Sequence, residues 1–307
     1  MDTREWALVI FTILAQMSVG AFVILGIVHF FASREAGLEE ADRLSTRALL
    51  AIGPTLALAG VASFFHLGNP INAPQAINNL ATSWMSREIV LVIAFSGLGA
   101  VFAFMQWRKL ASAAVRSTLA GVTAVVGLAM VYSMSQIYML KTMPSWNSLA
   151  TPLQFFVTTF LLGSLAVGAA FVANYAYVKR REPACAETQC SLLRSSVRWI
   201  ALGSIVLLGI EMIAVPLQLA FLSASGVPQG AASVALMYNR YGVLLALRLA
   251  FAFVGAGIFA LFLYRNSLTG GREQTLGALV YGAFTLVLAA EVLGRFIFYA
   301  THIKIGI

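Results

Sequence analysis

Long stretches without a formal charge dominate this chain, and they constrain its fold more than any other feature. Trp6–Ala32, Ala48–Phe65 and Ile89–Trp107 contain no Asp, Glu, Lys or Arg. A helix rises about 1.5 Å per residue, so about 20 apolar residues cross the hydrocarbon core of a bilayer. These stretches have about that length or more. The pattern therefore predicts an integral membrane protein.

The composition supports this class and excludes others. Of 307 residues, 60% are hydrophobic and 10% are charged, whereas soluble domains are about one-quarter charged. A disordered chain, a collagen and a disulfide-rich secreted domain are excluded. The net charge of +8 is typical of some nucleic-acid-binding proteins, but here the charges lie between apolar blocks. We therefore expect the lipid bilayer as a partner, and no nucleic acid.

The charged residues divide the sequence into apolar stretches that predict eight transmembrane helices, in one domain covering residues 1–307. The helices are expected at about 6–32, 47–67, 88–107, 116–140, 152–178, 198–222, 241–264 and 274–300. They are too long for the strands of a transmembrane barrel and do not alternate with period two. The predicted fold class is an all-α bundle of eight transmembrane helices. Met1–Glu5 is not a basic leader, so we expect the first helix to remain in the mature protein.

Lysine and arginine set the expected orientation. The loops after the first, third, fifth and seventh helices hold 13 basic residues, and the other loops and ends hold five. Basic loops favour the cytoplasm. Both termini are therefore expected on the outer side of the membrane.

The sequence offers few candidate ligands for a metal or a haem. Cys185 and Cys190 lie in an expected cytoplasmic loop, where thiols stay reduced, and two cysteines are too few for a zinc or iron–sulfur site. A haem with two histidine ligands needs both at one depth. His29 is expected at the inner surface, and His66 and His302 at the outer surface, where His302 lies past the end of the last helix and is poorly placed to hold a haem. We expect no metal and no haem in this protein.

Polar residues inside apolar helices are functional candidates, because burying them in lipid is costly. His66 is expected at the outer end of the second helix, and Glu88 at the outer start of the third. An imidazole and a carboxylate can take protons from a two-electron carrier. The last three helices contain Glu211, Arg248, Glu291 and Arg295. These four charges sum to zero, so they could also pair with one another and hold the bundle together.

Five motifs follow one another along the sequence. They are H-L-G-N-P at 66–70, S-W-M-S-R-E-I at 83–89, P-S-W-N-S at 144–148 after Tyr138, T-P-L-Q-F-F at 151–156 and A-E-V-L-G-R-F-I-F-Y at 290–299. In this order the set resembles the membrane anchor subunit of the dimethyl sulfoxide reductase family, over essentially the whole sequence.

The resemblance implies an eight-helix anchor without haem in a bacterial inner membrane, with both termini periplasmic, in a complex with two other subunits. One is a catalytic subunit with a molybdenum bis(guanine dinucleotide) cofactor, and the other is an iron–sulfur subunit with four 4Fe–4S clusters. The anchor binds menaquinol, or ubiquinol, and passes its electrons to the iron–sulfur subunit on the periplasmic face. By resemblance, His66 and Glu88 carry the quinol chemistry. The expected quinone contacts are His66, Gly68, Pro70, Trp84, Arg87, Glu88, Tyr138, Trp146, Arg248, Glu291 and Arg295.

Three alternatives to quinol oxidation for sulfoxide reduction remain open. The resemblance covers anchors of sulfite-oxidising complexes too, in which electrons run into the quinone pool. A secondary transporter would place its polar site near the middle of the membrane, whereas most of the polar residues here are expected in the outer half. A purely structural anchor would need none of His66, Glu88 or Arg295.

Overall fold

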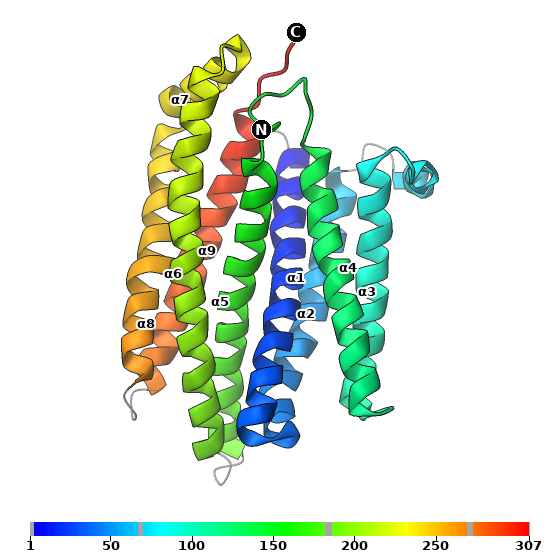
Figure 1. The fold of residues 1–307 in the computed structure, drawn as a ribbon, viewed down its shortest axis with the longest axis vertical. Coiled ribbons are helices and arrows are strands. Elements are labelled where there is room, and N and C mark those ends of the chain that lie inside the picture. Colours follow the sequence, from blue (N-terminus) through cyan, green and yellow to red (C-terminus); the bar gives the residue numbers. More distant parts are fainter. Residues whose placement is uncertain (1–2, 67–69, 182–185, 269–272, 307) are drawn as a thin grey trace.

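A computed structural model describes residues 3–66, 70–181, 186–268 and 273–306 of the protein. Its elements, in order, are α1 (Thr3–Ala36), α2 (Leu38–His66), the 3-10 helix η1 (Pro70–Asn79), α3 (Trp84–Arg108), α4 (Ala113–Ile137), α5 (Ala150–Arg181), α6 (Ala186–Ala224), α7 (Pro228–Ala252), the π-helix η3 (Phe253–Phe259), α8 (Ala260–Ser267) and α9 (Glu273–Ala300). Figure 1 shows the long helices side by side in one bundle. Within the described residues, eight spans are long and apolar enough to cross a membrane, and α7, η3 and α8 together form one of them. The expected class of all-α membrane bundle is confirmed.

Several helices begin before the expected residue. The sequence predicts starts near residue 47 for the second helix, 198 for the sixth and 241 for the seventh. In the structure, α2 begins at Leu38, α6 at Ala186 and α7 at Pro228. Charges mark where a helix leaves the hydrocarbon, and the helix can continue into the interface. Acidic residues in the first turn stabilise a helix N-terminus, and Pro is favoured at the first helical position. The expected limits therefore describe the apolar part of each helix.

Two helices form the centre of the bundle, α1 and α5. In the most apolar segments of α1 and α5, 72% and 67% of the residues are buried, more than in any other span of the described residues. A side chain on Gly20 would lie 1.8 Å from the carbonyl oxygen of Thr159, and one on Gly163 would lie 2.2 Å from the carbonyl carbon of Gly20. The two backbones touch at this crossing. Small residues allow such close packing of membrane helices.

The other helices lie around this centre. In the view of Figure 1, α3 and α4 form a hairpin at one edge, and α6, α7 and α8 lie at the other. The π-helix between α7 and α8 packs on α9, where a side chain on Gly255 would meet Val287 at 2.9 Å. This packing leaves α9 between α5 and α7, a position from which its polar residues can reach both helices.

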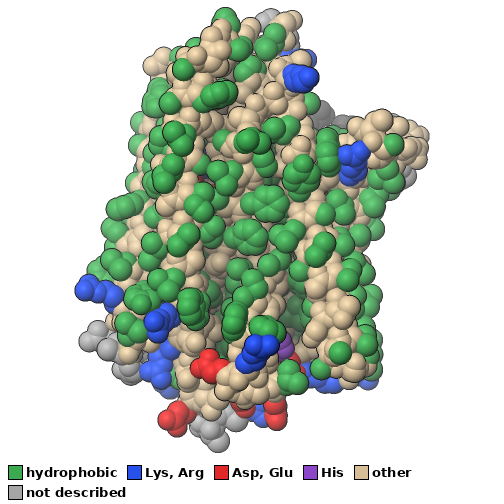
Figure 2. Space-filling model, in the orientation of Figure 1, with side chains coloured by type: hydrophobic (Ala, Val, Ile, Leu, Met, Phe, Trp, Pro, Cys, Tyr) green, Lys and Arg blue, Asp and Glu red, His purple; other side chains and the backbone are tan. Residues whose placement is uncertain are grey.

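Both ends of the protein lie at one end of the bundle, which we call the terminal end. The last turns of α2, α4 and α6 and the first turns of α3, α5 and α7 lie there too, whereas α1, α3, α5 and α8 end at the opposite end (Figure 1). Figure 2 shows most of the visible Lys, Arg, Asp and Glu side chains at the opposite end. The charge asymmetry expected from the loops is therefore present along the length of the bundle.

Candidate functional site

A hydrogen-bonded pair of tyrosines lies at the terminal end. Tyr138 directly follows α4 and Tyr299 lies in the last turn of α9, and their hydroxyl oxygens are 2.8 Å apart. Both side chains are buried. Burial raises the pKa of Tyr138 above its ordinary value, the neighbouring Tyr299 and Glu88 raise it further, and Arg295 lowers it. The Tyr138 phenol therefore stays protonated and can donate a hydrogen bond.

Trp146 forms an aromatic wall beside this pair. Its indole Nε1 donates a hydrogen bond to the carbonyl oxygen of Phe298 at 2.8 Å. The indole stacks on the Phe298 ring, with centroids 5.3 Å apart, and on the His302 ring at 4.5 Å. Tyr138 meets the indole edge-on. Rigid aromatic faces next to hydroxyl groups are typical of sites that bind a flat, polar-edged ring.

Arg295 lies one helical turn before Tyr299 and belongs to the same cluster. Its guanidinium carbon is 3.7 Å from the centre of the Phe155 ring, and its Nη2 donates to Oε1 of Gln16 at 2.9 Å. The guanidinium interacts electrostatically with Tyr138 and Tyr299. A buried cation held in this way can stabilise negative charge that develops on a nearby oxygen.

Glu88 lies in the second turn of α3 and interacts electrostatically with both tyrosines. Among the described residues, its carboxylate has no hydrogen-bond or ion-pair partner. The neighbouring Arg87 donates hydrogen bonds from Nε to the carbonyl oxygen of Leu80 at 2.8 Å and from Nη2 to that of Ala81 at 2.5 Å. The carboxylate is therefore free to accept a proton or a hydrogen bond from a ligand.

The start of α3 is fixed by local hydrogen bonds. Ser83 caps the helix by accepting from the backbone N–H of Ser86, and the Ser86 hydroxyl donates to the carbonyl oxygen of Ala76 in η1. Trp84 stacks under the guanidinium of Arg87 and meets the Tyr132 ring of α4 edge-on. These contacts hold Glu88 at a defined depth at the terminal end.

Part of the expected site falls outside the described residues. His66 is the last residue of α2, which ends at the terminal end, but its side chain lies outside the described part. Gly68 lies outside it entirely, and Pro70 begins η1 with its side chain outside. The helix that carries His66 thus ends at the same end of the bundle as Glu88 and Tyr138.

A second group of charges lies inside the bundle. Glu211 of α6 and Arg248 of α7 form an ion pair at 2.8 Å, and both are buried. Glu291 of α9 accepts a hydrogen bond from Thr158 of α5 at 2.6 Å. Glu291 and Arg295 share a helix face by spacing, but Arg295 turns to Gln16 instead. The charges therefore pair across helices and not along α9.

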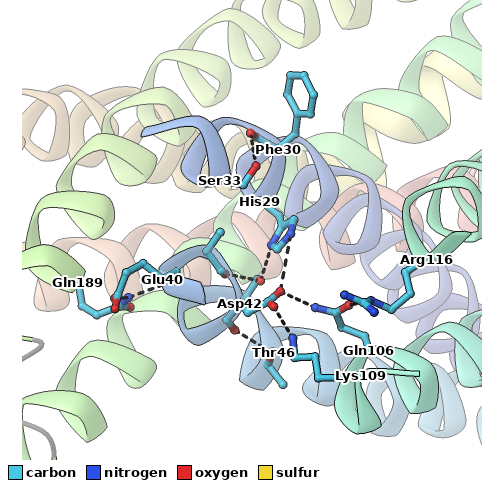
Figure 3. A network of polar contacts seen from close by, with 12 residues as sticks. His29, Phe30, Ser33, Glu40, Asp42, Thr46, Gln106, Lys109, Arg116 and Gln189 are labelled. Carbon is cyan, nitrogen blue, oxygen red and sulfur yellow. Dashed lines mark hydrogen bonds and ion pairs between the residues drawn. The ribbon is translucent and has the colours of Figure 1, made fainter. Parts of the chain in front are cut away.

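His29 belongs to a polar network at the opposite end, shown in Figure 3. Its Nδ1 is 2.9 Å from the hydroxyl of Ser45, and its Nε2 is 3.8 Å from Asp42. Asp42 also accepts hydrogen bonds from Gln106 and Lys109, which connects α1, α2 and α3. His29 and the end of α2 that carries His66 therefore lie at opposite ends of the bundle.

Sequence reasoning missed several members of the cluster at the terminal end. Tyr299 and Phe155 belong to the motifs at 290–299 and 151–156, but the sequence does not single them out as site residues, because an aromatic residue in an apolar helix gives no signal of its own. Gln16 did give a signal, since it is an amide in the middle of an otherwise apolar helix. The partners of these residues come from helices far apart in sequence, so the spacing could not reveal them.

Comparisons with known proteins identify the family. Residues 1–301 match the family model described as DMSO reductase anchor subunit (DmsC). The protein is 29% identical over 308 residues to the C subunit of anaerobic dimethyl sulfoxide reductase from Escherichia coli K12, a match that spans 99% of this sequence and 96% of that subunit. It is 28% identical over 304 residues to the anaerobic dimethyl sulfoxide reductase subunit YnfH of the same organism, and 26% identical over 302 residues to the C subunit from Haemophilus influenzae, with 96% of each relative covered. The protein belongs to the DMSO reductase anchor subunit family.

Proposed function

We propose that this anchor subunit oxidises a membrane quinol and passes the electrons to an iron–sulfur subunit, which feeds a molybdenum subunit that reduces dimethyl sulfoxide. The observation that carries the proposal is the Glu88 carboxylate, which lies beside the Tyr138–Tyr299 pair and has no hydrogen-bond or ion-pair partner among the described residues. Proton acceptors, hydroxyl donors and aromatic walls are the groups that a quinol ring requires. The names of the relatives support dimethyl sulfoxide as the terminal substrate.

The chemistry divides between proton acceptors and hydrogen-bond donors. Oxidation of a quinol to a quinone releases two protons and two electrons. His66 and Glu88 take the protons, one from each hydroxyl. The Tyr138 phenol donates a hydrogen bond to a ring oxygen, and Arg295 stabilises negative charge that forms on it.

Other expected quinone contacts have different support. Trp146 lies in the aromatic wall, whereas Trp84 and Arg87 lie at the start of α3 with Glu88. Gly68 and Pro70, which follow the end of α2, stay predictions. Contacts of the quinone with Arg248 and Glu291 also stay predictions, because these two residues have partners inside the bundle.

The test separates quinol chemistry from assembly. We expect His66→Leu to lower quinol-dependent turnover by at least about 10²-fold, because positioned acid–base groups contribute about 10²–10⁴-fold. We expect Glu88→Gln to lower it by less. Glu88→Gln is milder because the amide still forms hydrogen bonds. Activity with a dye that reduces the partner subunits directly should not change, and both activities are measured on the same membranes.

A matched control is Glu187→Gln, which removes an exposed carboxylate from the first turn of α6. It should leave both activities unchanged. If quinol and dye activities fall together in His66→Leu and Glu88→Gln, these residues support the structure and the proposed site is wrong. If neither activity falls, the quinol binds elsewhere.

We also propose that this subunit holds no haem. His29 lies at the opposite end from the end of α2, so His29 and His66 cannot face each other at one depth. The third histidine, His302, lies past the end of α9, where its ring stacks on Trp146 and its Nδ1 is 2.6 Å from the carbonyl oxygen of Tyr299. A reduced-minus-oxidised spectrum of the purified complex should therefore show no b-type band from this subunit. A band that disappears in His66→Ala would overturn this proposal.

A further inference from the structure

A cavity opens between α5, α6, α7 and α9 in the half of the bundle nearer the terminal end. The volume of this cavity is about 40 Å³. Ser145, in the loop after α4, lies on its wall, and so does Ser233 near the start of α7. Leu245, Arg248 and Gly294 line its deeper part. The cavity therefore extends from the loops of the terminal end to the buried arginine.

The polar atoms on this wall lack protein partners. Among the described residues, the hydroxyls of Ser145 and Ser233 and the Nε of Arg248 are buried without a hydrogen-bond partner. All three residues line the same cavity. Buried polar groups are nearly always satisfied by protein or by ordered water. Three unsatisfied groups around one cavity indicate that a small polar ligand fills it.

Two amides add to the polar wall. Gln154 of α5 donates to Oε1 of Gln218 in α6 at 2.5 Å, and Gln218 donates to the carbonyl oxygen of Ser145 at 3.1 Å. Both amides line the cavity. A purely apolar cavity stays dry, but a roomy cavity with several polar partners holds water. The space is sufficient for a small cluster of water molecules.

A second, smaller cavity continues toward the ion pair. It is lined by Gln154, Thr158, Glu211 and Arg248 among others, and it shares Gln154 and Arg248 with the first. Oε2 of Glu211 is buried and has no partner among the described residues. The two cavities thus share the Arg248 side chain in their walls, and the ion-pair residues that carry the unsatisfied atoms line them.

We propose that these cavities form a water-filled inlet from the terminal end of the bundle to the Glu211–Arg248 ion pair. A charged pair within a membrane is costly when it is dry, because both ions lose their hydration. Water in the inlet hydrates the Arg248 Nε and the free oxygen of Glu211. The inlet ends at the Glu211 carboxylate, and Thr158, which lines the smaller cavity, donates a hydrogen bond to a second carboxylate, Glu291. Such a row of waters gives protons a route between the outside of the bundle and these carboxylates.

The inlet goes beyond the proposed quinol site and depends on different residues. The quinol proposal rests on Glu88, Tyr138 and Arg295, and the inlet rests on Ser233, Gln154 and Arg248. Trp146 and Phe298 lie on the wall of the inlet as well as in the aromatic cluster. The experiment therefore reads the accessibility of the inlet and not quinol turnover, so each proposal can fail alone.

The test is the reaction of introduced thiols with Ag⁺, an ion of about the size of a water molecule. Ser145→Cys, Ser233→Cys and Leu245→Cys report on the mouth, the middle and the deep part of the inlet. They are made in a background in which Cys185 and Cys190 are Ser. The whole complex is placed in lipid nanodiscs, where both faces are open to the reagent, and dye activity confirms assembly. After denaturation this subunit is separated from its partners by electrophoresis, and its unreacted thiols are counted with a maleimide.

The matched control is Ser204→Cys, a fully buried serine of α6 outside both cavities, whose hydroxyl donates to the carbonyl oxygen of Ile200. We expect Ser233→Cys and Leu245→Cys to react at least about tenfold faster than the control, since a closed site reacts only through rare local openings. Reaction of Ser145→Cys alone would show that the inlet is closed below its mouth and would overturn the proposal. Rates for Ser233→Cys and Leu245→Cys equal to the control would overturn it too.

Discussion

A single glycine of α9 sets the position of Arg248. A side chain on Gly294 would lie 2.5 Å from the Nε of Arg248 and 2.7 Å from its guanidinium carbon. We expect Gly294→Ala to displace the guanidinium from Glu211 and to lower the free energy of unfolding by roughly 1–3 kcal/mol, as overpacking typically does. The measurement is the thermal midpoint of the purified complex. The control is Gly209→Ala in α6, where nothing lies within 4 Å of the new methyl group. Equal midpoints for the two variants would contradict this role of Gly294.

The residues of the site were partly predictable at this scale. Glu88, Arg248 and Arg295 stand out because a charge in an apolar helix is rare. The partners of the charged residues of α9 do not stand out, because Arg295 bonds to Gln16 of α1 and Glu291 to Thr158 of α5, which are far away in the sequence. A spacing of four residues places Glu291 and Arg295 on one face of a helix, but it cannot tell whether a neighbouring helix offers better partners. In this bundle two neighbouring helices do.

At the scale of elements, the crossing of α1 and α5 is the closest contact to test. We expect Gly163→Ala to force the two helices apart, because its methyl group would lie 2.2 Å from the backbone of Gly20. The cost should be at least about 1–3 kcal/mol, and less of the complex should assemble in the membrane. Quantifying assembled subunit by immunoblot checks this. Gly97→Ala in α3, which has open space around it, should assemble normally. Normal assembly of Gly163→Ala would show that the two backbones do not touch at this crossing.

The helices themselves could be predicted from hydropathy, and their ends could not. In a bilayer every backbone polar group must be satisfied within the helix, so each apolar stretch of sufficient length becomes a helix. Outside the hydrocarbon, polar turns can be helical or not, and the extra turns of α2 and α6 depend on tertiary partners. Gln189 of α6, for example, donates to the carbonyl oxygen and the carboxylate of Glu40 in α2. Such a contact between distant segments is invisible in hydropathy.

At the scale of the whole molecule, the charge asymmetry of Figure 2 sets the expected orientation in the membrane. Thirteen basic residues belong to the loops after the first, third, fifth and seventh helices, against five at the other end. Because basic loops are retained in the cytoplasm, we expect a reporter fused after Arg181 to be active in the cytoplasm and one fused after Ile307 to be active in the periplasm. Glu88 and the tyrosine pair would then lie near the periplasmic surface, where an iron–sulfur partner can accept electrons over a short distance. Reversed signals would place the proposed quinol site and the proposed partner on the cytoplasmic face, while the helix packing and the proposed inlet would stand unchanged.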